Sequence, residues 1–305
     1  MALTSDEEML DVPTNGVHWL LQNHRDLIDA EIALNEGGGV ALKDGIPLFN
    51  RLQLSEKVSV SYRLEVKDPG GHSAVPRKEN AIYRLAEGLA RLAKYDFPFK
   101  LTDATRGFFG RMAGIDRGQD GSDMQAILRV PLDSSAAARL STRPTYNAQL
   151  RTTCVATRLE GGEAGNALPQ SARATVNCRA LPGESVLEVQ QTLVNVLGDP
   201  KIEVTQIGGY TASSPSPLNA EIVHSIERLT GEFWPGIPVV PVMSTGATDA
   251  RFLRNAGIAT YGHSGLAGDI FDGRAHGKDE RFLVKSFFDG EEYLYRLVKA
   301  LSSRK

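Results

Sequence analysis

Acidic side chains are grouped near the beginning of the chain. Glu7 and Glu8 are adjacent and follow a short apolar start, and Glu36 ends a second apolar run that leads into three glycines. We interpret each run as a buried strand that stops at its acids, with Gly16–His24 as the crossover helix of a β-α-β unit. Because the carboxyl ends of parallel strands open onto one crevice, the three acids are expected to meet there. Converging carboxylates repel unless a cation lies among them, so the pattern indicates a metal site.

Five short motifs, spread over nearly the whole chain, carry a resemblance to a known family. In chain order they are Thr4-Ser5-Asp6-Glu7-Glu8, Leu34-Asn35-Glu36-Gly37-Gly38, Gly70-Gly71-His72-Ser73-Ala74-Val75-Pro76, Gly165-Asn166-Ala167-Leu168-Pro169 and Arg274-Ala275-His276-Gly277-Lys278-Asp279-Glu280. Each motif alone is weakly specific. Together they resemble the aminoacylase/carboxypeptidase G family of two-zinc metallopeptidases, which includes acetylornithine deacetylase and succinyl-diaminopimelate desuccinylase.

The resemblance implies a role for each residue of the metal site. Glu7 would be the general base, Glu8 a ligand of one zinc ion, Glu36 an acidic ligand of the other, and His276 the imidazole ligand of that second ion. Two Zn²⁺ per subunit are therefore expected in the complete site, with Co²⁺ or Mn²⁺ as alternatives. Without the family, Ser5 to Glu8 is equally typical of the solvated acidic start of a helix.

The resemblance also implies a homodimer and residues that hold the substrate. His72 would reach the active site of the partner subunit and donate a hydrogen bond to the oxyanion. Asn166 and Arg179 match positions that hold the polar end and the carboxylate of the substrate, for which the planar fork of arginine is suited. The alternatives are that His72 is only a turn residue and that Arg179 is a solvated residue of an edge strand.

A loop near the C-terminal end completes the predicted substrate cleft. Gly246, Thr248 and Asp249 resemble the Gly-Gly-Thr-Asp-x-Arg loop of the family, with Ala247 in place of the second glycine. A helix is expected to begin at this loop, and its first N–H groups would be free to bind an anion.

The periodicity of apolar residues divides the chain into two domains. Between residues 56 and about 210 it predicts the β-α-β-β-α-β order of a ferredoxin-like sandwich, with strands at 58–66, 147–159, 172–180 and 201–207 and helices at 77–94 and 185–197. We therefore predict an inserted lid and dimerisation domain over 56–211. A split zinc-peptidase-like α/β domain, which lacks its N-terminal strands, would comprise 1–55 and 212–305. Residues 95–143 are predicted to be rich in loops.

Composition narrows the class of function. The 305 residues carry a net charge of -3, without a basic run, so no nucleic-acid partner is expected. No apolar stretch approaches the roughly 20 residues of a membrane helix, so no membrane segment is expected. Cys154 and Cys178 flank a glycine-rich turn and are candidate cross-strand neighbours, but we expect two free buried thiols.

Two classes of function stay open. The first is a metal-dependent hydrolase, a peptidase or N-acyl-amino-acid deacylase, that cleaves an amide next to a free carboxylate in a small peptide or N-acyl amino acid. Members of the family carry an upstream His-x-Asp and a bridging Asp, and the chain begins after both, so we expect a truncated form with impaired activity. The second class is a non-catalytic dimerisation or binding module. The compartment, cytoplasmic or exported, is left open.

Overall fold

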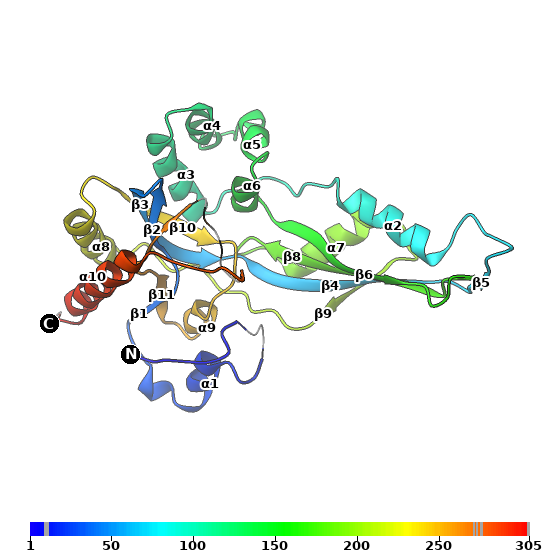
Figure 1. Ribbon diagram of the computed structural model, residues 1–305, viewed down its shortest axis with the longest axis horizontal. Coiled ribbons are helices and arrows are strands. Elements are labelled where there is room, and N and C mark those ends of the chain that lie inside the picture. Colours follow the sequence, from blue (N-terminus) through cyan, green and yellow to red (C-terminus); the bar gives the residue numbers. More distant parts are fainter. Residues whose placement is uncertain (9–11, 271, 273, 275–276, 304–305) are drawn as a thin grey trace.

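The fold consists of a globular part and an elongated arm (Figure 1). The computed structural model describes residues 1–8, 12–270, 272, 274 and 277–303. His276, one of the predicted metal ligands, lies outside the described residues. The class predicted from the sequence, mixed α/β, is confirmed, since each part combines a sheet with helices.

A mixed sheet of six strands forms the centre of the globular part. Its strands are β1 (Ile32–Asn35), β2 (Gly39–Lys43), β3 (Ile46–Glu56), β10 (Val239–Ser244), β11 (Ala259–Gly262) and β12 (Ala267–Asp269). The order is β1-β11-β3-β2-β12, and β10 pairs with β3. β1 runs parallel to β11 and β10 parallel to β3, whereas β2 runs antiparallel to β3. The sheet therefore brings the chain's two ends into one structure.

Helices cover both faces of this sheet because the strand side chains alternate between two cores. Val40 and Leu42 contact the core under α8 (Ala220–Phe233) and α10 (Val284–Ser302), whereas Ala41 between them contacts the opposite core. That opposite core is formed with α3 (Asp103–Ile115), α4 (Gln119–Ile127), α5 (Ser134–Leu140) and α6 (Pro144–Leu150). At one edge, α1 (Gly16–Asn23), which is followed by the short 3-10 helix η1 (Arg25–Leu27), packs on α9 (Ala250–Asn255).

The arm contains an antiparallel sheet of four strands. They are β4 (Val58–Lys67), β6 (Thr153–Gly161), β8 (Ser171–Ala180) and β9 (Glu203–Ile207), in the order β6-β8-β4-β9. Helices α2 (Ala81–Leu92) and α7 (Val186–Leu197) bury one face. This arrangement is the predicted ferredoxin-like β-α-β-β-α-β order. A small ribbon of β5 (Gly71–His72) and β7 (Ala167–Leu168) lies at the tip.

The structure corrects three sequence-based expectations. Residues 1–8 contain no strand, so α1 is not the crossover of a β-α-β unit that starts there. Residues 95–143, predicted to be rich in loops, contain the three helices α3, α4 and α5. The strand predicted over 147–159 begins only at Thr153, because residues 147–150 still belong to α6. Although α3–α6 fall within the predicted 56–211 domain, they pack on the six-stranded sheet.

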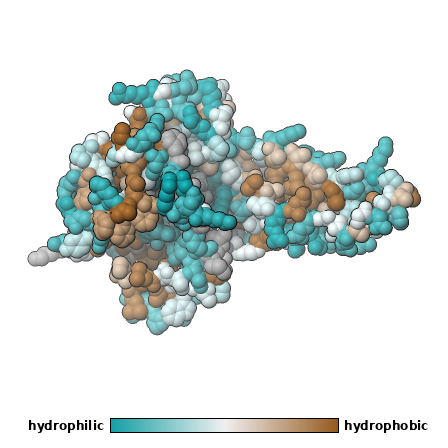
Figure 2. Space-filling model, viewed as in Figure 1, coloured by the Kyte–Doolittle hydropathy of each residue, from teal (hydrophilic) through white to brown (hydrophobic). Residues whose placement is uncertain are grey.

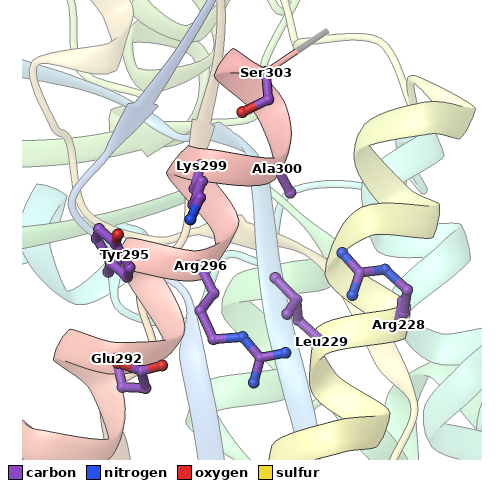
Figure 3. A pocket seen from close by; sticks show the side chains of 8 residues that line it. All are labelled: Arg228, Leu229, Glu292, Tyr295, Arg296, Lys299, Ala300 and Ser303. Atoms are coloured by element: carbon purple, nitrogen blue, oxygen red, sulfur yellow. The ribbon is translucent and has the colours of Figure 1, made fainter.

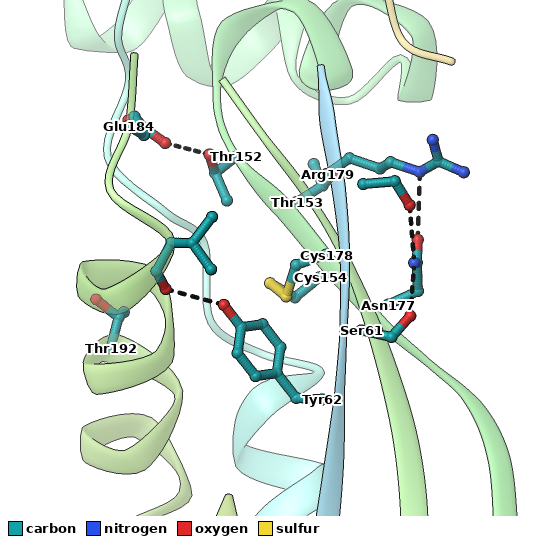
Figure 4. Close-up of a disulfide and its surroundings, with 12 residues drawn as sticks. Ser61, Tyr62, Thr152, Thr153, Cys154, Asn177, Cys178, Arg179, Glu184 and Thr192 are labelled. Carbon is teal, nitrogen blue, oxygen red and sulfur yellow. Dashed lines mark hydrogen bonds between the residues drawn. A yellow bond between two sulfur atoms is a disulfide. The ribbon is translucent and has the colours of Figure 1, made fainter. Parts of the chain in front are cut away.

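The two cysteines are not free thiols, as the sequence analysis expected. Cys154 and Cys178 are direct neighbours in the β6–β8 register, with Cα atoms 4.1 Å apart, and they form a disulfide (Figure 4). Buried thiols were expected because free cysteine is commonly buried. In the β6–β8 register, however, the two cysteines lie close enough to form a covalent bond. The disulfide therefore fixes the edge strand β6 to the centre of the arm.

Apolar side chains are also found on the surface. Figure 2 shows them gathered over the start of α10 and over the middle of the arm. Just before α10 and in its first turns, the exposed apolar residues are Phe282, Leu283, Val284, Phe287 and Phe288. Within the part of the chain that the structure describes, no helix combines the length and apolar character needed to cross a membrane.

Candidate active site

Carboxylates from distant segments converge beside the end of β1. The carboxyl groups of Glu7 and Glu36 lie close enough to interact with each other. Asp249 and Glu8 lie close enough to repel both of them. The predicted meeting of Glu7, Glu8 and Glu36 is thus found in the fold, even though Glu7 and Glu8 lie in a turn rather than at the end of a strand.

Burial and mutual repulsion raise the pKa values of this carboxylate cluster. Burial is the largest cause of the raised pKa of Glu7, and repulsion by Glu36 adds to it, so that the pKa reaches about 7. Burial also raises the pKa of Glu36 and of Asp249. Like charges close together disfavour ionisation of both groups, which is why these pKa values lie above the ordinary range.

Asn15 connects the N-terminal segment to the cluster. Its side-chain oxygen accepts a hydrogen bond from the backbone N–H of His18, 3.0 Å away, and so caps α1. Its side-chain nitrogen donates to Asp249, 2.7 Å away in a buried position. One side chain therefore starts the helix and holds a carboxylate of the cluster, which positions Glu7 and Glu8 beside the 244–249 loop.

The glycines after Glu36 are needed for the close approach of neighbouring strands. Gly37, Gly38 and Gly39 all have positive φ angles. A Cβ atom on Gly38 would lie 2.6 Å from the carbonyl oxygens of Arg51 and Gly262. The chain can therefore turn sharply after β1, and this turn keeps Glu36 at the edge of the sheet.

A hydrogen-bond network supports the loop that was predicted to line the substrate cleft. The Thr248 hydroxyl donates to the Glu56 carboxylate over 2.7 Å, and both side chains are buried. Glu56 also forms a buried ion pair with Arg254. In the same loop, the N–H of Gly246 donates to the Ser244 hydroxyl over 3.1 Å. Glu56 thus anchors the loop from the end of β3.

Arg251 places a buried guanidinium next to the carboxylates. Its Nη1 donates to the carbonyl oxygen of Thr248 over 3.2 Å, and its guanidinium lies 4.5 Å from the centre of the Phe252 ring. Its Nε and Nη2 are buried and have no hydrogen-bond partner among the described residues. Buried donors without partners are rare, so this guanidinium has capacity for an anion.

His72 and Asn166 lie together at the tip of the arm, away from the six-stranded sheet of their own chain (Figure 1). His72 pairs with Ala167 across the β5–β7 ribbon, and the Ser73 N–H donates to the Asn166 carbonyl oxygen over 3.0 Å. Both residues are exposed, and Nδ1 of His72 accepts from the N–H of Ala74 over 3.0 Å. The fold therefore brings these two predicted residues together without joining them to the carboxylate cluster of the same chain.

Arg179 lies on an inner strand, so the alternative of a solvated edge residue is wrong. β8 pairs with β4 on one side and with β6 on the other. Nε of Arg179 donates to the Asn177 side chain over 3.2 Å, as Figure 4 shows. Burial lowers the pKa of Arg179, and the half-buried guanidinium is held in place by a polar neighbour. A positioned arginine of this kind can bind a carboxylate.

Comparison with known proteins decides what the arm is. Residues 54–205 match the peptidase dimerisation domain family of M20 peptidases. The chain carries an M20 dimerisation domain. It is 28% identical over 279 residues to the probable carboxypeptidase S-like 2 of Dictyostelium discoideum, covering 88% of this chain and 52% of that protein. It is 27% identical over 315 residues to the human N-fatty-acyl-amino acid synthase/hydrolase PM20D1, covering 98% of this chain and 60% of that protein.

Solved structures of peptidases share the fold. An M20 family metallo-carboxypeptidase from Sulfolobus solfataricus aligns with a TM-score of 0.66 at 17% identity, over 96% of this chain and 68% of that one. Aminopeptidase PepT from Bacillus cereus aligns with a TM-score of 0.56 at 15% identity, over 98% of this chain and 63% of that one. The resemblance predicted from the five motifs is therefore confirmed. The chain spans 52% and 60% of the length of the two curated relatives named above.

The carboxylate cluster fits a divalent cation in its chemistry, and its described part is an incomplete ligand set. Glu7, Glu8 and Glu36 repel one another, and a cation bound among them would offset this repulsion. Within residues 1–8, 12–270, 272, 274 and 277–303, no three His, Cys, Asp or Glu side chains are arranged to hold a metal ion. The predicted roles of Glu8, Glu36 and His276 as ligands stay predictions.

A separate groove of about 490 Å³ lies between α8 and α10 (Figure 3). It is lined by Arg228, Leu229, Glu292, Tyr295, Arg296, Lys299, Ala300 and Ser303. None of these residues belongs to the carboxylate cluster. Two of its cations are already engaged, since both Arg228 and Arg296 pair with Glu232.

Several residues of the candidate site were missed in the sequence. Asn15 precedes a helical pattern, which is the usual signal of an N-cap, but nothing in the sequence connects it to Asp249. Glu56 and Arg254 are separated by almost two hundred residues, so their buried pairing has no local signal. Arg251 was recognised only as part of the loop motif.

Proposed function

We propose that this protein is a metal-dependent amide hydrolase, a peptidase or N-acyl-amino-acid deacylase, which cleaves an amide next to a free carboxylate. One observation carries the proposal: Glu7 and Glu36, predicted from motifs as base and metal ligand, lie close together in a partly buried cluster of carboxylates. Neighbouring carboxylates of this kind are costly to a fold and are usually found where they serve chemistry. The M20 relatives, which are named as peptidases and hydrolases, support the same class.

The carboxylates divide the chemistry between them. Glu8 would hold one divalent cation, and Glu36 together with His276 would hold the other. Zn²⁺ is proposed for both, with Co²⁺ or Mn²⁺ as alternatives. Such a cation supplies Lewis acidity when it is bound. Glu7 takes a proton from the attacking water and returns it to the leaving amine nitrogen, so that its carboxylate is regenerated in each turnover. Asn15 keeps Asp249 in place beside Glu7 while the proton moves.

Two arginines support a substrate that carries a carboxylate. Arg251 has two buried nitrogens without a partner among the described residues, and it lies in the loop of Gly246, Thr248 and Asp249. Arg179 is held on an inner strand by Asn177. Both guanidinium groups suit a carboxylate, because a planar fork donates two parallel hydrogen bonds. An N-acyl amino acid or a short peptide provides such a group next to the amide.

The position of His72 supports a dimer in which each site uses two chains. We propose that the dimerisation domain, residues 56–211, joins two subunits, and that residues 1–55 and 212–305 form the catalytic domain. Because His72 and Asn166 lie at the tip of the arm, they are free to serve the partner subunit. The His72 imidazole would donate a hydrogen bond to the oxygen that becomes negative as water adds to the amide. Because α3–α6 pack on the six-stranded sheet, these helices would lie with the catalytic domain in space although they fall within 56–211 in the sequence.

Hydrolysis of a panel of N-acyl amino acids and dipeptides, with zinc supplied, tests the proposal. Glu7→Gln should lower kcat by about 10²-fold or more, since a general base contributes on this order. Glu31→Gln is the matched control, because Glu31 is an exposed acid of the same N-terminal region. Unchanged turnover in Glu7→Gln would remove Glu7 as the base.

A non-catalytic dimerisation or binding module is the second candidate. It is favoured by the fact that the family match covers the dimerisation domain, residues 54–205, and not the carboxylate cluster. Sedimentation equilibrium together with the hydrolysis panel separates the two. A stable dimer that hydrolyses no member of the panel supports the binding module, and turnover that is lost in Glu7→Gln supports the hydrolase.

The Cys154–Cys178 disulfide bears on the compartment. Disulfides form and persist in oxidising environments and are rare in reducing cytosol. Of the two compartments left open by the sequence, we therefore propose the exported one. Titration of free thiols in protein from its natural source checks this, and two reactive thiols per chain would contradict it.

A further inference from the structure

A second cavity lies on the helix side of the arm, apart from the carboxylate cluster. It encloses about 500 Å³ between the C-terminal end of α2, the following segment, α6 and the first half of β6. Its lining residues are Leu89, Leu92, Ala93, Tyr95, Asp96, Phe97, Asn147, Arg151, Thr152, Thr153, Cys154, Val155 and Ala156. Cavities of 300–1,000 Å³ at the junction of two packed units are typical of small-molecule sites.

Arg151 provides a buried cation at this cavity. The residue is only 4% exposed, and its guanidinium lies 4.0 Å from the centre of the Phe99 ring. Nη1 pairs with Asp96 over 3.1 Å and Nη2 donates to the Ser141 hydroxyl over 3.3 Å. Nε is buried and has no partner among the described residues. The guanidinium therefore keeps one donor available for an acceptor that is not part of the chain.

The backbone around Arg151 is held before any ligand arrives. The Lys57 ammonium donates to the Arg151 carbonyl oxygen over 2.7 Å and to that of Ala148 over 3.1 Å. The next residue, Thr152, accepts a hydrogen bond from the N–H of Leu181 over 2.9 Å. A preorganised guanidinium loses little freedom on binding, which favours affinity.

Asp96 is an ion-pair partner of Arg151 that a ligand can replace. The Asp96 side chain is 74% exposed, whereas that of Arg151 is 4% exposed. An exposed carboxylate at the mouth can turn outward to solvent at little cost, and a ligand carboxylate can then take its place on Nη1.

We propose that this cavity binds a small monocarboxylate with an apolar body. The carboxylate would pair with Arg151, and the body would lie against the apolar walls formed by Leu89, Leu92, Phe97 and Val155. The site is independent of the proposed hydrolase chemistry, because none of its lining residues belongs to the carboxylate cluster. Octanoate is a suitable probe, and octanol is its matched control with the same body and no charge.

Calorimetric titration of the purified protein tests the site. Octanoate should bind at one site per chain, at least tenfold more tightly than octanol. Asp96→Asn should tighten octanoate severalfold and leave octanol unchanged, since it weakens the competing partner of Arg151 at an exposed position. Octanoate binding no tighter than octanol, no measurable octanoate binding, or an Asp96→Asn variant with unaltered affinity would each overturn the proposal.

Two exposed positions on β6 provide a control for where octanoate binds. Ala156 lines the cavity and Thr157 does not, and both are exposed. Ala156→Phe should reduce octanoate affinity at least tenfold by filling the cavity, whereas Thr157→Phe should leave it within twofold. Equal effects of the two substitutions would place the octanoate elsewhere and contradict this site.

Discussion

Glu36 and Glu56 stand at the ends of two strands of the same sheet, and their surroundings are opposite. Glu56, at the end of β3, pairs with buried Arg254 and accepts hydrogen bonds from Thr248 over 2.7 Å and from Gln53 over 3.3 Å. Glu36, just after β1, faces the other acids Glu7, Glu8 and Asp249. One carboxylate is thus satisfied by the chain itself, while the other is surrounded by like charges.

The difference separates a structural carboxylate from a functional one. A buried acid whose charge is neutralised and whose oxygens are bonded stabilises the connection between β3 and the loop at 244–249. An acid among acids does not stabilise the fold, so its place is explained by something the chain binds. Substitutions at the two positions should therefore change stability with opposite signs.

Among the substitutions that test this difference, removal of the Arg254 cation should change the free energy of unfolding most. Arg254→Met leaves Glu56 charged, buried and unpaired, and also removes the bonds to the Ser213 hydroxyl at 3.0 and 2.9 Å. Breaking a buried pair from one side costs about 3–5 kcal/mol of unfolding free energy. Arg228→Met, which breaks an exposed pair with Glu232, is the control and should cost about 1 kcal/mol or less. Urea unfolding measures both, and similar losses would contradict the assignment of Glu56.

His263 shows a third solution at this sheet, a buried group that stays neutral. Its Nδ1 lies 2.8 Å from the Arg51 carbonyl oxygen and therefore carries the proton, so Nε2 accepts from the Tyr293 hydroxyl, 2.8 Å away. Burial lowers the pKa of His263 to about 4. The imidazole is thus held in its uncharged form throughout the physiological range of pH.

This lowered pKa predicts how stability depends on pH. Between the ordinary value near 6.5 and the folded value near 4, the unfolded chain binds a proton that the folded chain does not. The contribution is fully present above pH 6.5 and should be lost as the pH falls to 4, amounting to about 3 kcal/mol. Urea unfolding from pH 7.5 to 4 measures it. His263→Gln should lack this part of the pH dependence, and an unchanged profile in that variant would refute the assignment.

Amphipathic elements could be predicted from the sequence because their burial is one-sided. β4 alternates between a buried and a more exposed face, and α8 buries Ile222, Ile226 and Leu229 at helical spacing. The helices α3 and α4 were missed because glycines interrupt their pattern. Some of these glycines allow close packing, since a Cβ atom on Gly107 would lie 2.8 Å from Pro241 and one on Gly121 would lie 1.7 Å from the Asp116 carbonyl oxygen.

Only those residues of the candidate site that belong to sequence motifs could be predicted. Glu7 and Glu36 were identified together because both belong to motifs, although the strand assigned before Glu7 does not exist. The partners that distinguish Glu36 from Glu56 come from residues far away in the sequence, such as Arg254. No local pattern carries that information, because a buried ion pair depends on the tertiary packing of both residues.

The smallest effect, and the one that sharpens the comparison most, is expected at Glu36 itself. Glu36→Gln removes a charge from among like charges, so without added metal it should stabilise the fold by about 0.5–1 kcal/mol, discounted for partial exposure. Glu56→Gln should destabilise it, because the Arg254 cation is left buried. With excess ZnCl₂ the unsubstituted protein should become more stable than Glu36→Gln. The unsubstituted protein gains stability by binding the cation, and Glu36→Gln does not. If Glu36→Gln is destabilising without metal, or responds to zinc as fully as the unsubstituted protein, then Glu36 is a structural acid like Glu56.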